Sequence, residues 1–180
     1  MIYGAHRSGS NGGTLRPAAS CLTHPKGHVT EPSGDRDGLG MFTNRRTVRI
    51  EWGHCDPAGI VFYPRYFEMF DHSTVLLIER AVGMNKHQLY RTYDFDGYPV
   101  VETRARFLLP TRYGDDVIIE TSITEVRRSS FHLQHRLTRE GALAVEGFES
   151  RVWVVRDADK PGRLKPQPLP PDIVAQLTSA

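Results

Sequence analysis

Residues Ile50 to Phe70, IEWGHCDPAGIVFYPRYFEMF, combine an acidic side chain with the expected start of a helix. An apolar run stops at Gly53, and a short polar loop then places Asp56 just ahead of a long apolar segment entered through Pro64. Backbone N–H groups at the start of a helix are unpaired and carry the positive end of the helix dipole. They can stabilise an oxygen that gains negative charge during a reaction. An acid beside such donors is the minimum equipment for hydrolysing an activated acyl group.

The elements that must position this loop form an α+β pattern. The spacing of apolar residues predicts a strand over Phe42 to Trp52 and a helix over Tyr63 to Val82 that is apolar on nearly every side. The remaining expected elements are a short helix, Asn85 to Thr92, and four strands, Tyr98 to Leu109, Val117 to Val126, Ser130 to Arg139 and Ala142 to Arg156. Short turns between these strands predict antiparallel neighbours. We therefore expect a long central helix wrapped by a curled five-stranded antiparallel sheet.

The two ends of the chain differ in composition from this domain, which we expect to span residues 41–160. Residues 1–40 are rich in Gly, Ser and Pro and are predicted to be a disordered extension, either genuine or preceding a true start at Met41. Residues 161–180 carry five prolines. They predict an extended tail with at most one helical turn, at Asp172 to Leu177.

Composition excludes several classes of function. The 180 residues carry a formal charge of only +2, and no basic face is interleaved with aromatic residues, so we expect no nucleic-acid partner. No apolar run approaches the roughly 20 residues that cross a bilayer, so we expect no membrane partner. The two cysteines, Cys21 and Cys55, are poor material for a disulfide framework, which favours a cytoplasmic location.

The motif G-x-C-D-P-A-G-I-V-x-Y-P-x-Y, followed later by D-D-V-I-I-E and E-V-R-R-S-S-F, resembles the hotdog-fold acyl-CoA thioesterases. The nearest resemblance is to the 4-hydroxybenzoyl-CoA thioesterase family, which is related to the YbgC-like short-chain thioesterases. It covers Phe42 to Val155. The resemblance implies a hotdog fold, an acyl-CoA substrate and a site at a dimer interface, in a homodimer or a homotetramer built from two dimers.

The resemblance also implies roles for three residues around the predicted helix. Asp56 matches the catalytic carboxylate, which can attack the thioester carbonyl or activate water. Tyr63 matches the position whose backbone N–H polarises that carbonyl. Asp71 matches a position near the acyl group. Each residue also fits a purely architectural role, with Asp56 as a turn residue, Tyr63 as a helix start and Asp71 as half of a surface ion pair.

Further matched positions concern binding of the substrate. Phe62 replaces another aromatic residue of the closest enzymes, and Tyr98 replaces a Thr, which leaves an aromatic-lined acyl pocket but departs from the hydroxybenzoyl pattern. Arg127 and Arg128 match basic residues that meet the phosphates of coenzyme A, and Ser129 and Ser130 can add contacts. Without the resemblance, this segment is an ordinary charged turn.

Three further kinds of site fit the sequence less well. Cys55 as a nucleophile with His54 is disfavoured, because neighbours on an extended chain point to opposite sides. His132 and His135, three apart on a predicted strand, also face opposite sides, so we expect no metal site. A histidine-dependent hotdog dehydratase is disfavoured by the D-P-A-G block.

We therefore expect a thioesterase that hydrolyses a CoA thioester of an aromatic acid, such as a benzoyl or hydroxybenzoyl group. It should need no metal or redox cofactor, with coenzyme A entering only as part of the substrate. The alternatives are a short-chain aliphatic acyl-CoA thioesterase and a CoA-ester-binding protein without catalysis.

Overall fold

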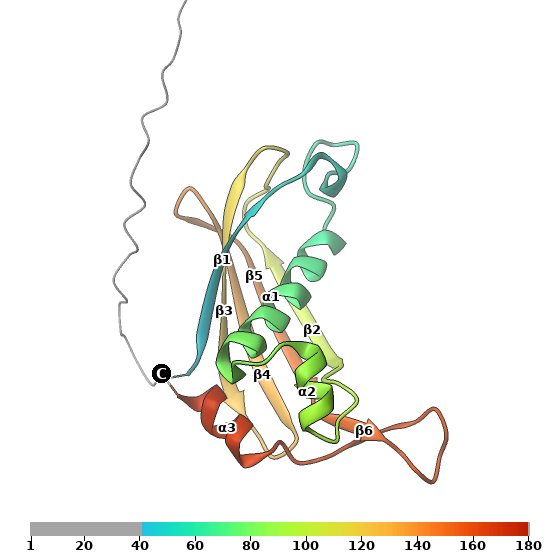
Figure 1. Ribbon diagram of the computed structural model, residues 1–180. Coiled ribbons are helices and arrows are strands. Elements are labelled where there is room, and N and C mark those ends of the chain that lie inside the picture. Colours follow the sequence, from blue (N-terminus) through green and yellow to red (C-terminus); the bar gives the residue numbers. More distant parts are fainter. Residues whose placement is uncertain (1–40, 180) are drawn as a thin grey trace, which may run out of the picture. The chain divides into compact units, whose positions relative to one another are not determined.

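The computed structural model describes residues 41–179 (Figure 1). The predicted disorder of residues 1–40 lies outside this part of the chain. The strands are β1 (Thr43–Arg49), β2 (Val100–Phe107), β3 (Asp116–Val126), β4 (Ser130–Arg139), β5 (Ala142–Val152), β6 (Val154–Arg156) and β7 (Leu164–Pro166). The helices are α1 (Pro64–Val82), α2 (Lys86–Thr92) and α3 (Pro171–Thr178), with a 3-10 turn, η1, at Trp52–His54.

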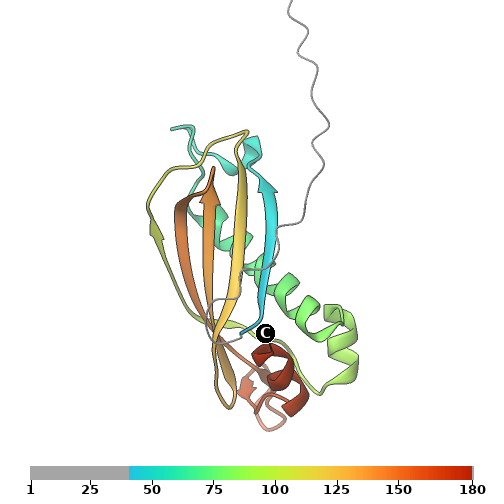
Figure 2. The ribbon, with the colours of Figure 1, turned by 90° about the vertical axis from the view of Figure 1, so that its left-hand side faces the viewer.

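Five strands form one antiparallel sheet in the order β1-β3-β4-β5-β2. Helix α1 crosses one face of this sheet, as Figure 2 shows from the side. Strands β4 and β5 are joined by Glu140 and Gly141, both with positive φ, which suits a tight hairpin. The predicted α+β fold, a central helix against a five-stranded antiparallel sheet, is confirmed.

Local sequence explains the bounds of α1. Pro64 occupies its first turn, and Gly83 ends it in the left-handed conformation with φ of 68°. Phe70, on the buried face, lies against Gly147 of β5, where an added Cβ would come within 2.6 Å of the Phe70 ring. The absence of a side chain at residue 147 therefore lets the helix approach the sheet closely.

Three predicted strands are shorter in the structure. The strand expected over Tyr98 to Leu109 forms only β2, Val100–Phe107. The first predicted strand ends at Arg49 rather than Trp52, because Glu51 and His54 cap a 3-10 turn, with the Glu51 N–H donating to His54 Nδ1 at 3.0 Å. The last predicted strand divides at Trp153. Its N–H donates to Ser129 O at 2.9 Å, and the chain then leaves the main sheet to pair with β7.

The C-terminal segment is more ordered than its prolines predicted. Instead of an extended tail with one helical turn, it forms β7 and the eight-residue helix α3. Pro171 lies in the first turn of α3, where its missing N–H costs no hydrogen bond. Leu169, Ile173 and Leu177 are buried against the C-terminal half of α1, so this segment completes one of two hydrophobic clusters.

Candidate active site

The loop that carries Asp56 is closed by its own hydrogen bonds. Cys55 and Val61 form an antiparallel bridge, and the Asp56 N–H donates to Ile60 O at 2.9 Å. Gly59 adopts a φ of 75°, which a residue with a side chain rarely adopts, and its N–H donates to Asp56 O at 2.9 Å. The loop therefore holds the backbone of Asp56 in one conformation just ahead of α1.

The Asp56 carboxylate is half-buried, and within the described residues only one of its two oxygens is hydrogen-bonded. Its Oδ1 accepts a hydrogen bond from the Ala58 N–H at 2.8 Å, and its Oδ2 has no partner among residues 41–179. The side-chain direction is thus set locally while one oxygen stays available. The neighbouring His54 accepts from the Glu51 N–H through Nδ1, and Cys55 Sγ lies 4.0 Å from Glu51 O. Within the described residues no hydrogen bond joins the two side chains, so they do not form a nucleophile pair.

The start of α1 offers an unpaired backbone donor. The Phe62 N–H donates to His54 O at 2.9 Å, and Pro64 has no N–H. Between them, the Tyr63 N–H has no acceptor within the described part of the chain. Tyr63 itself is the helix N-cap, so its amide lies at the positive end of the helix dipole.

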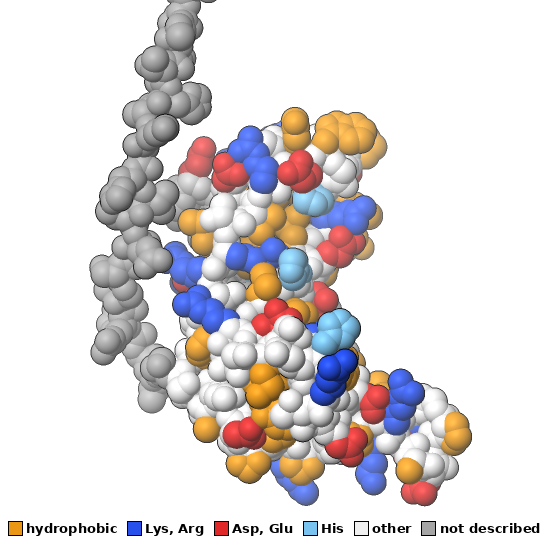
Figure 3. Space-filling view, in the orientation of Figure 1, with side chains coloured by type: hydrophobic (Ala, Val, Ile, Leu, Met, Phe, Trp, Pro, Cys, Tyr) orange, Lys and Arg blue, Asp and Glu red, His pale blue; other side chains and the backbone are white. Residues whose placement is uncertain are grey.

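A hollow of about 270 Å³ lies beside this helix start. It is lined by Ile60, Val61, Tyr63, Tyr66, Phe107, Leu108, Leu109 and Pro110. The Phe107 ring lies 6.3 Å from the Tyr63 ring and 5.7 Å from the Tyr66 ring, and Phe62 packs edge-on against Tyr63. Hydrophobic side chains are also exposed at this end of the face that carries α1 (Figure 3). The hollow suits an apolar or aromatic group.

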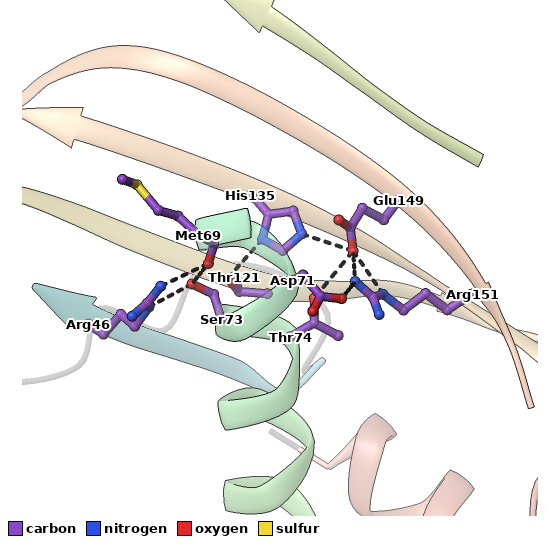
Figure 4. Close-up of polar contacts among 9 residues, drawn as sticks. All are labelled: Arg46, Met69, Asp71, Ser73, Thr74, Thr121, His135, Glu149 and Arg151. Atoms are coloured by element: carbon purple, nitrogen blue, oxygen red, sulfur yellow. Dashed lines mark hydrogen bonds and ion pairs between the residues drawn. The ribbon is translucent and has the colours of Figure 1, made fainter. Parts of the chain in front are cut away.

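Asp71 lies farther along α1 and is held by an arginine of the sheet (Figure 4). Its Oδ1 accepts from Arg151 Nη2 at 2.7 Å, while its side chain remains 60 % exposed. The surface ion pair considered from the sequence is therefore present. The second oxygen, Oδ2, has no partner within the described residues, so an ion pair and a ligand contact are compatible at this position.

Arg151 connects Asp71 to a buried polar cluster that the sequence did not reveal. Glu149 Oε2 accepts from Arg151 at 2.9 and 2.7 Å and lies 3.5 Å from His135 Nε2. Burial acts to raise the pKa of Glu149, but the His135 contact and the Arg151 charge outweigh it and leave that pKa below its ordinary value. One signal in the sequence could have indicated this cluster. The alternating pattern of β4 places His135 on the same face as the apolar residues that point into the core.

Tyr98 lies within the core instead of lining an open pocket. Its side chain is 5 % exposed and packs against Phe95 and Phe131. Burial raises its pKa to about 12, although the charge of Arg151 acts in the opposite direction. Its hydroxyl has no hydrogen-bond partner among the described residues. A direct contact between Tyr98 and the substrate stays a prediction.

The predicted phosphate-binding segment lies far from Asp56 in the same chain. Arg127 and Arg128 form the turn after β3, beside α3, where the Leu169 N–H donates to Arg128 O. The opposite end of β3 adjoins the loop that carries Asp56, because the Ile50 N–H donates to Asp115 O. An 11-residue strand spans roughly 35 Å, so one chain does not bring the two groups together (Figure 1).

The arginine pair is also unequal. Arg127 is exposed and forms an ion pair with Glu125 at 2.8 Å, whereas Arg128 has no side-chain partner within residues 41–179. Ser129 and Ser130 are half-buried, and their carbonyl oxygens accept from Trp153 and Arg127, respectively. In the described part of the chain, no three His, Cys, Asp or Glu side chains gather to hold a metal ion, and no helix could span a membrane.

Comparisons with known proteins match this geometry. The profile of the Thioesterase-like superfamily matches residues 50–177. The 4-hydroxybenzoyl-CoA thioesterase of Pseudomonas sp. strain CBS-3 is 32 % identical over 131 residues, covering 70 % of this chain and 91 % of that protein. The solved structure of a variant 4-hydroxybenzoyl-CoA thioesterase in complex with 4-hydroxybenzoyl-CoA is 31 % identical, with a TM-score of 0.68, covering 76 % of this chain and 99 % of that one.

A gentisyl-coenzyme A thioesterase structure is 30 % identical, with a TM-score of 0.64, and covers 73 % of this chain and 99 % of that one. These likenesses extend over nearly the whole described domain. The chain belongs to the Thioesterase-like superfamily and has its hotdog fold. Its enzyme class is that of a thioester hydrolase.

Proposed function

We propose that this chain hydrolyses the CoA thioester of an aromatic acid, with Asp56 as the nucleophile or general base. The observation that carries the proposal is the free oxygen of Asp56 on a rigid loop next to an unpaired amide at the start of α1. The same loop supplies Ile60 and Val61 to the aromatic hollow. A thioester carbonyl bound there would meet a carboxylate and a backbone donor together.

Two routes use this arrangement. In the first, Asp56 Oδ2 attacks the carbonyl carbon, the Tyr63 N–H stabilises the oxyanion, and the C–S bond breaks to release the CoA thiolate. Water then cleaves the resulting mixed anhydride and restores the carboxylate. In the second, Asp56 takes a proton from water as that water attacks the carbonyl, the C–S bond then breaks to release the acid, and the proton passes from Asp56 to the CoA thiolate. Both routes need only water and the chain's own groups, with coenzyme A as part of the substrate.

The hollow favours an aromatic acyl group over a short aliphatic one. Three of its lining residues, Tyr63, Tyr66 and Phe107, have rings within 6.3 Å of a neighbouring ring, which can pack on a planar guest. The relatives that act on 4-hydroxybenzoyl-CoA and gentisyl-CoA support the same class of substrate. Asp71, with one oxygen free, is proposed to accept a hydrogen bond from a substituent on the ring.

A second copy of the chain is part of this proposal. Edge strand β2 is exposed along most of its length, and Val101 and Phe107 are 63 % and 50 % exposed. Such an edge can pair with another strand. Because Arg128 lies at the far end of β3 from Asp56, the phosphates of a substrate bound at Asp56 would be met by Arg127 and Arg128 of a partner copy, in a homodimer or homotetramer.

The test is thiol release from a panel of CoA esters, ranked by kcat/KM. The panel should contain benzoyl-CoA, 4-hydroxybenzoyl-CoA and butyryl-CoA. The proposal predicts that both aromatic esters exceed butyryl-CoA. A preference for butyryl-CoA would replace the aromatic substrate with a short aliphatic one, and binding without any thiol release would contradict catalysis altogether.

A further inference from the structure

Arg151 occupies an unusual position, because it joins a buried carboxylate to an exposed one. Its side chain is 4 % exposed, yet Nη2 contacts both Glu149 Oε2 and Asp71 Oδ1 at 2.7 Å (Figure 4). A guanidinium taken out of water needs partners for its N–H groups. Its Nε and Nη2 both donate to Glu149, and because the guanidinium is a planar fork, these two bonds fix its orientation.

The support for Arg151 comes from several elements at once. Glu149 also accepts from Thr74 Oγ1 of α1 at 3.3 Å and lies 3.5 Å from His135 Nε2. The other nitrogen of His135, Nδ1, lies 2.9 Å from Thr121 Oγ1 of β3, and its ring stacks on Phe70 with centroids 4.6 Å apart. Residues of α1, β3, β4 and β5 thus hold Arg151 in place through Glu149.

The charges leave Asp71 able to accept a hydrogen bond. Arg151 carries one positive charge and Glu149 one negative charge, so the buried pair is already neutral. Asp71 adds a second carboxylate to the same guanidinium, with Oδ1 held and Oδ2 free within the described residues. A carboxylate oriented in this way presents an anionic acceptor in a defined direction, and it does not need to be ordered when a ligand arrives.

Holding α1 to the sheet does not by itself explain this cluster. On the side of α1 next to β1, Arg46 does the same with neutral acceptors, donating to Met69 O at 2.8 Å and to Ser73 Oγ at 2.7 Å. That contact holds no carboxylate, and the remaining nitrogen of Arg46, Nη1, lies 3.5 Å from Nδ1 of the exposed His72. The Arg151 contact differs because its last partner is the carboxylate of Asp71, which is 60 % exposed and has only one oxygen bonded within the described residues.

We propose that Arg151, fixed by Glu149 and His135, is a positioning residue that orients Asp71 Oδ2 toward a hydrogen-bond donor on the acyl group. The acyl class this selects is an aromatic ring that bears a hydroxyl, over the same ring without one. The inference rests on the proposed function for the site, but it assigns a role to residues that do not touch the substrate. Arg151 acts only through Asp71.

The test measures binding in chains that carry Asp56→Asn, so that the ester stays intact. The dissociation constants of 4-hydroxybenzoyl-CoA and benzoyl-CoA are measured by calorimetry, and their ratio is the preference for the hydroxyl. We expect Asp71→Ala to reduce this preference roughly tenfold, because a hydrogen bond to a charged group is lost. Arg151→Lys, which keeps the charge but loses the fork, should reduce it to a similar degree.

The combined variant separates positioning from a second, independent contact. If Arg151 acts only through Asp71, then Arg151→Lys causes no further loss of preference when Asp71→Ala is already present. Arg46→Lys is the matched control, since it weakens the opposite attachment of α1 and should leave the preference unchanged. Thermal unfolding of each variant shows whether the substitution destabilises the fold. A purely structural effect should weaken the binding of both esters equally and leave their ratio unchanged.

An unchanged preference in Arg151→Lys, or losses that multiply in the combined variant, would overturn the positioning role. So would the absence of any preference in the chain that carries only Asp56→Asn. Thiol release from benzoyl-CoA by the unsubstituted chain is measured in parallel and tests the proposed function separately. A chain that hydrolyses both esters but ignores the hydroxyl would disprove the role of Arg151 and leave the thioesterase function standing.

Discussion

Asp56 and Asp71 are both acidic residues beside α1, but the protein holds them in opposite ways. Asp56 is fixed by its own loop, through the Ala58 N–H two residues away. Asp71 is fixed by Arg151, 80 residues away, and through it by the buried Glu149. The first arrangement survives changes elsewhere in the sheet, whereas the second depends on the register of three strands. A local support suits the reacting role proposed for Asp56, and a distant one suits the selecting role proposed for Asp71.

The largest expected effect is the loss of turnover in Asp56→Asn. Asparagine keeps an oxygen for the Ala58 N–H but can neither attack the thioester nor take a proton from water. We expect kcat to fall by roughly 100- to 10,000-fold, with little change in substrate affinity. Asp71→Ala should show the reverse, with lost affinity for the hydroxylated ester and kcat for benzoyl-CoA largely kept. Equal kcat losses in the two variants would remove the distinction between them.

The next effect concerns the buried support of Asp71. Glu149→Gln removes the negative charge beside Arg151 and should lower the free energy of unfolding by about 3 kcal/mol, measured by urea denaturation. Among the described residues, the polar partners of Glu149 are Thr74, His135 and Arg151, and none belongs to the loop around Asp56. The value of kcat for benzoyl-CoA in the folded variant should therefore stay close to that of the unsubstituted chain. A variant as stable as the original would show that the buried pair contributes nothing net.

The same residue predicts a dependence of stability on pH. The pKa of Glu149 lies below its ordinary value of 4.5, so its ionised form stabilises the fold. That contribution is complete above about pH 4.5 and is lost as the pH falls through the lower pKa of the folded state. Urea denaturation between about pH 3 and pH 6 should show a steeper fall on acidification in the unsubstituted chain than in Glu149→Gln.

A smaller effect is expected where α1 meets the sheet. In Gly147→Ala the new Cβ would lie 2.6 Å from the Phe70 ring, which stacks on His135. The strain should cost about 1–3 kcal/mol of unfolding free energy. Gly53→Ala is the control, because nothing lies within 4 Å of its added Cβ. Equal stability of the two variants would mean that α1 can move away without cost.

The smallest effect distinguishes the two arginines after β3. Arg127 is already paired with Glu125, while Arg128 has no side-chain partner among residues 41–179. Arg128→Ala should therefore raise KM by about fivefold, equivalent to about 1 kcal/mol, and more than Arg127→Ala does. Added salt should shrink the difference. An unchanged KM in both variants would contradict phosphate binding by this turn.

These contrasts also show which parts of the molecule could be predicted from the sequence. The Asp56 loop is encoded within a few residues by its prolines and glycines, and the period of apolar residues predicts α1 and the strands. The contact between Arg151 and Asp71 depends on long-range register, such as the pairing of Thr121 with His135, which no local pattern contains. Helix α3 was predicted only as a possible turn at Asp172 to Leu177, because the five prolines outweighed the helical spacing of the apolar residues Ile173 and Leu177.

The catalytic role proposed for Asp56 is tested most directly by a single-turnover measurement, with enzyme in excess over the aromatic CoA ester that gives the highest kcat/KM. The rate constant for thiol release then reports the chemical step alone, and substrate binding is measured on the same samples. We predict that Asp56→Asn binds the ester as the unsubstituted chain does and releases thiol at least about 100-fold more slowly. Release at an unchanged rate from the bound ester would contradict this role.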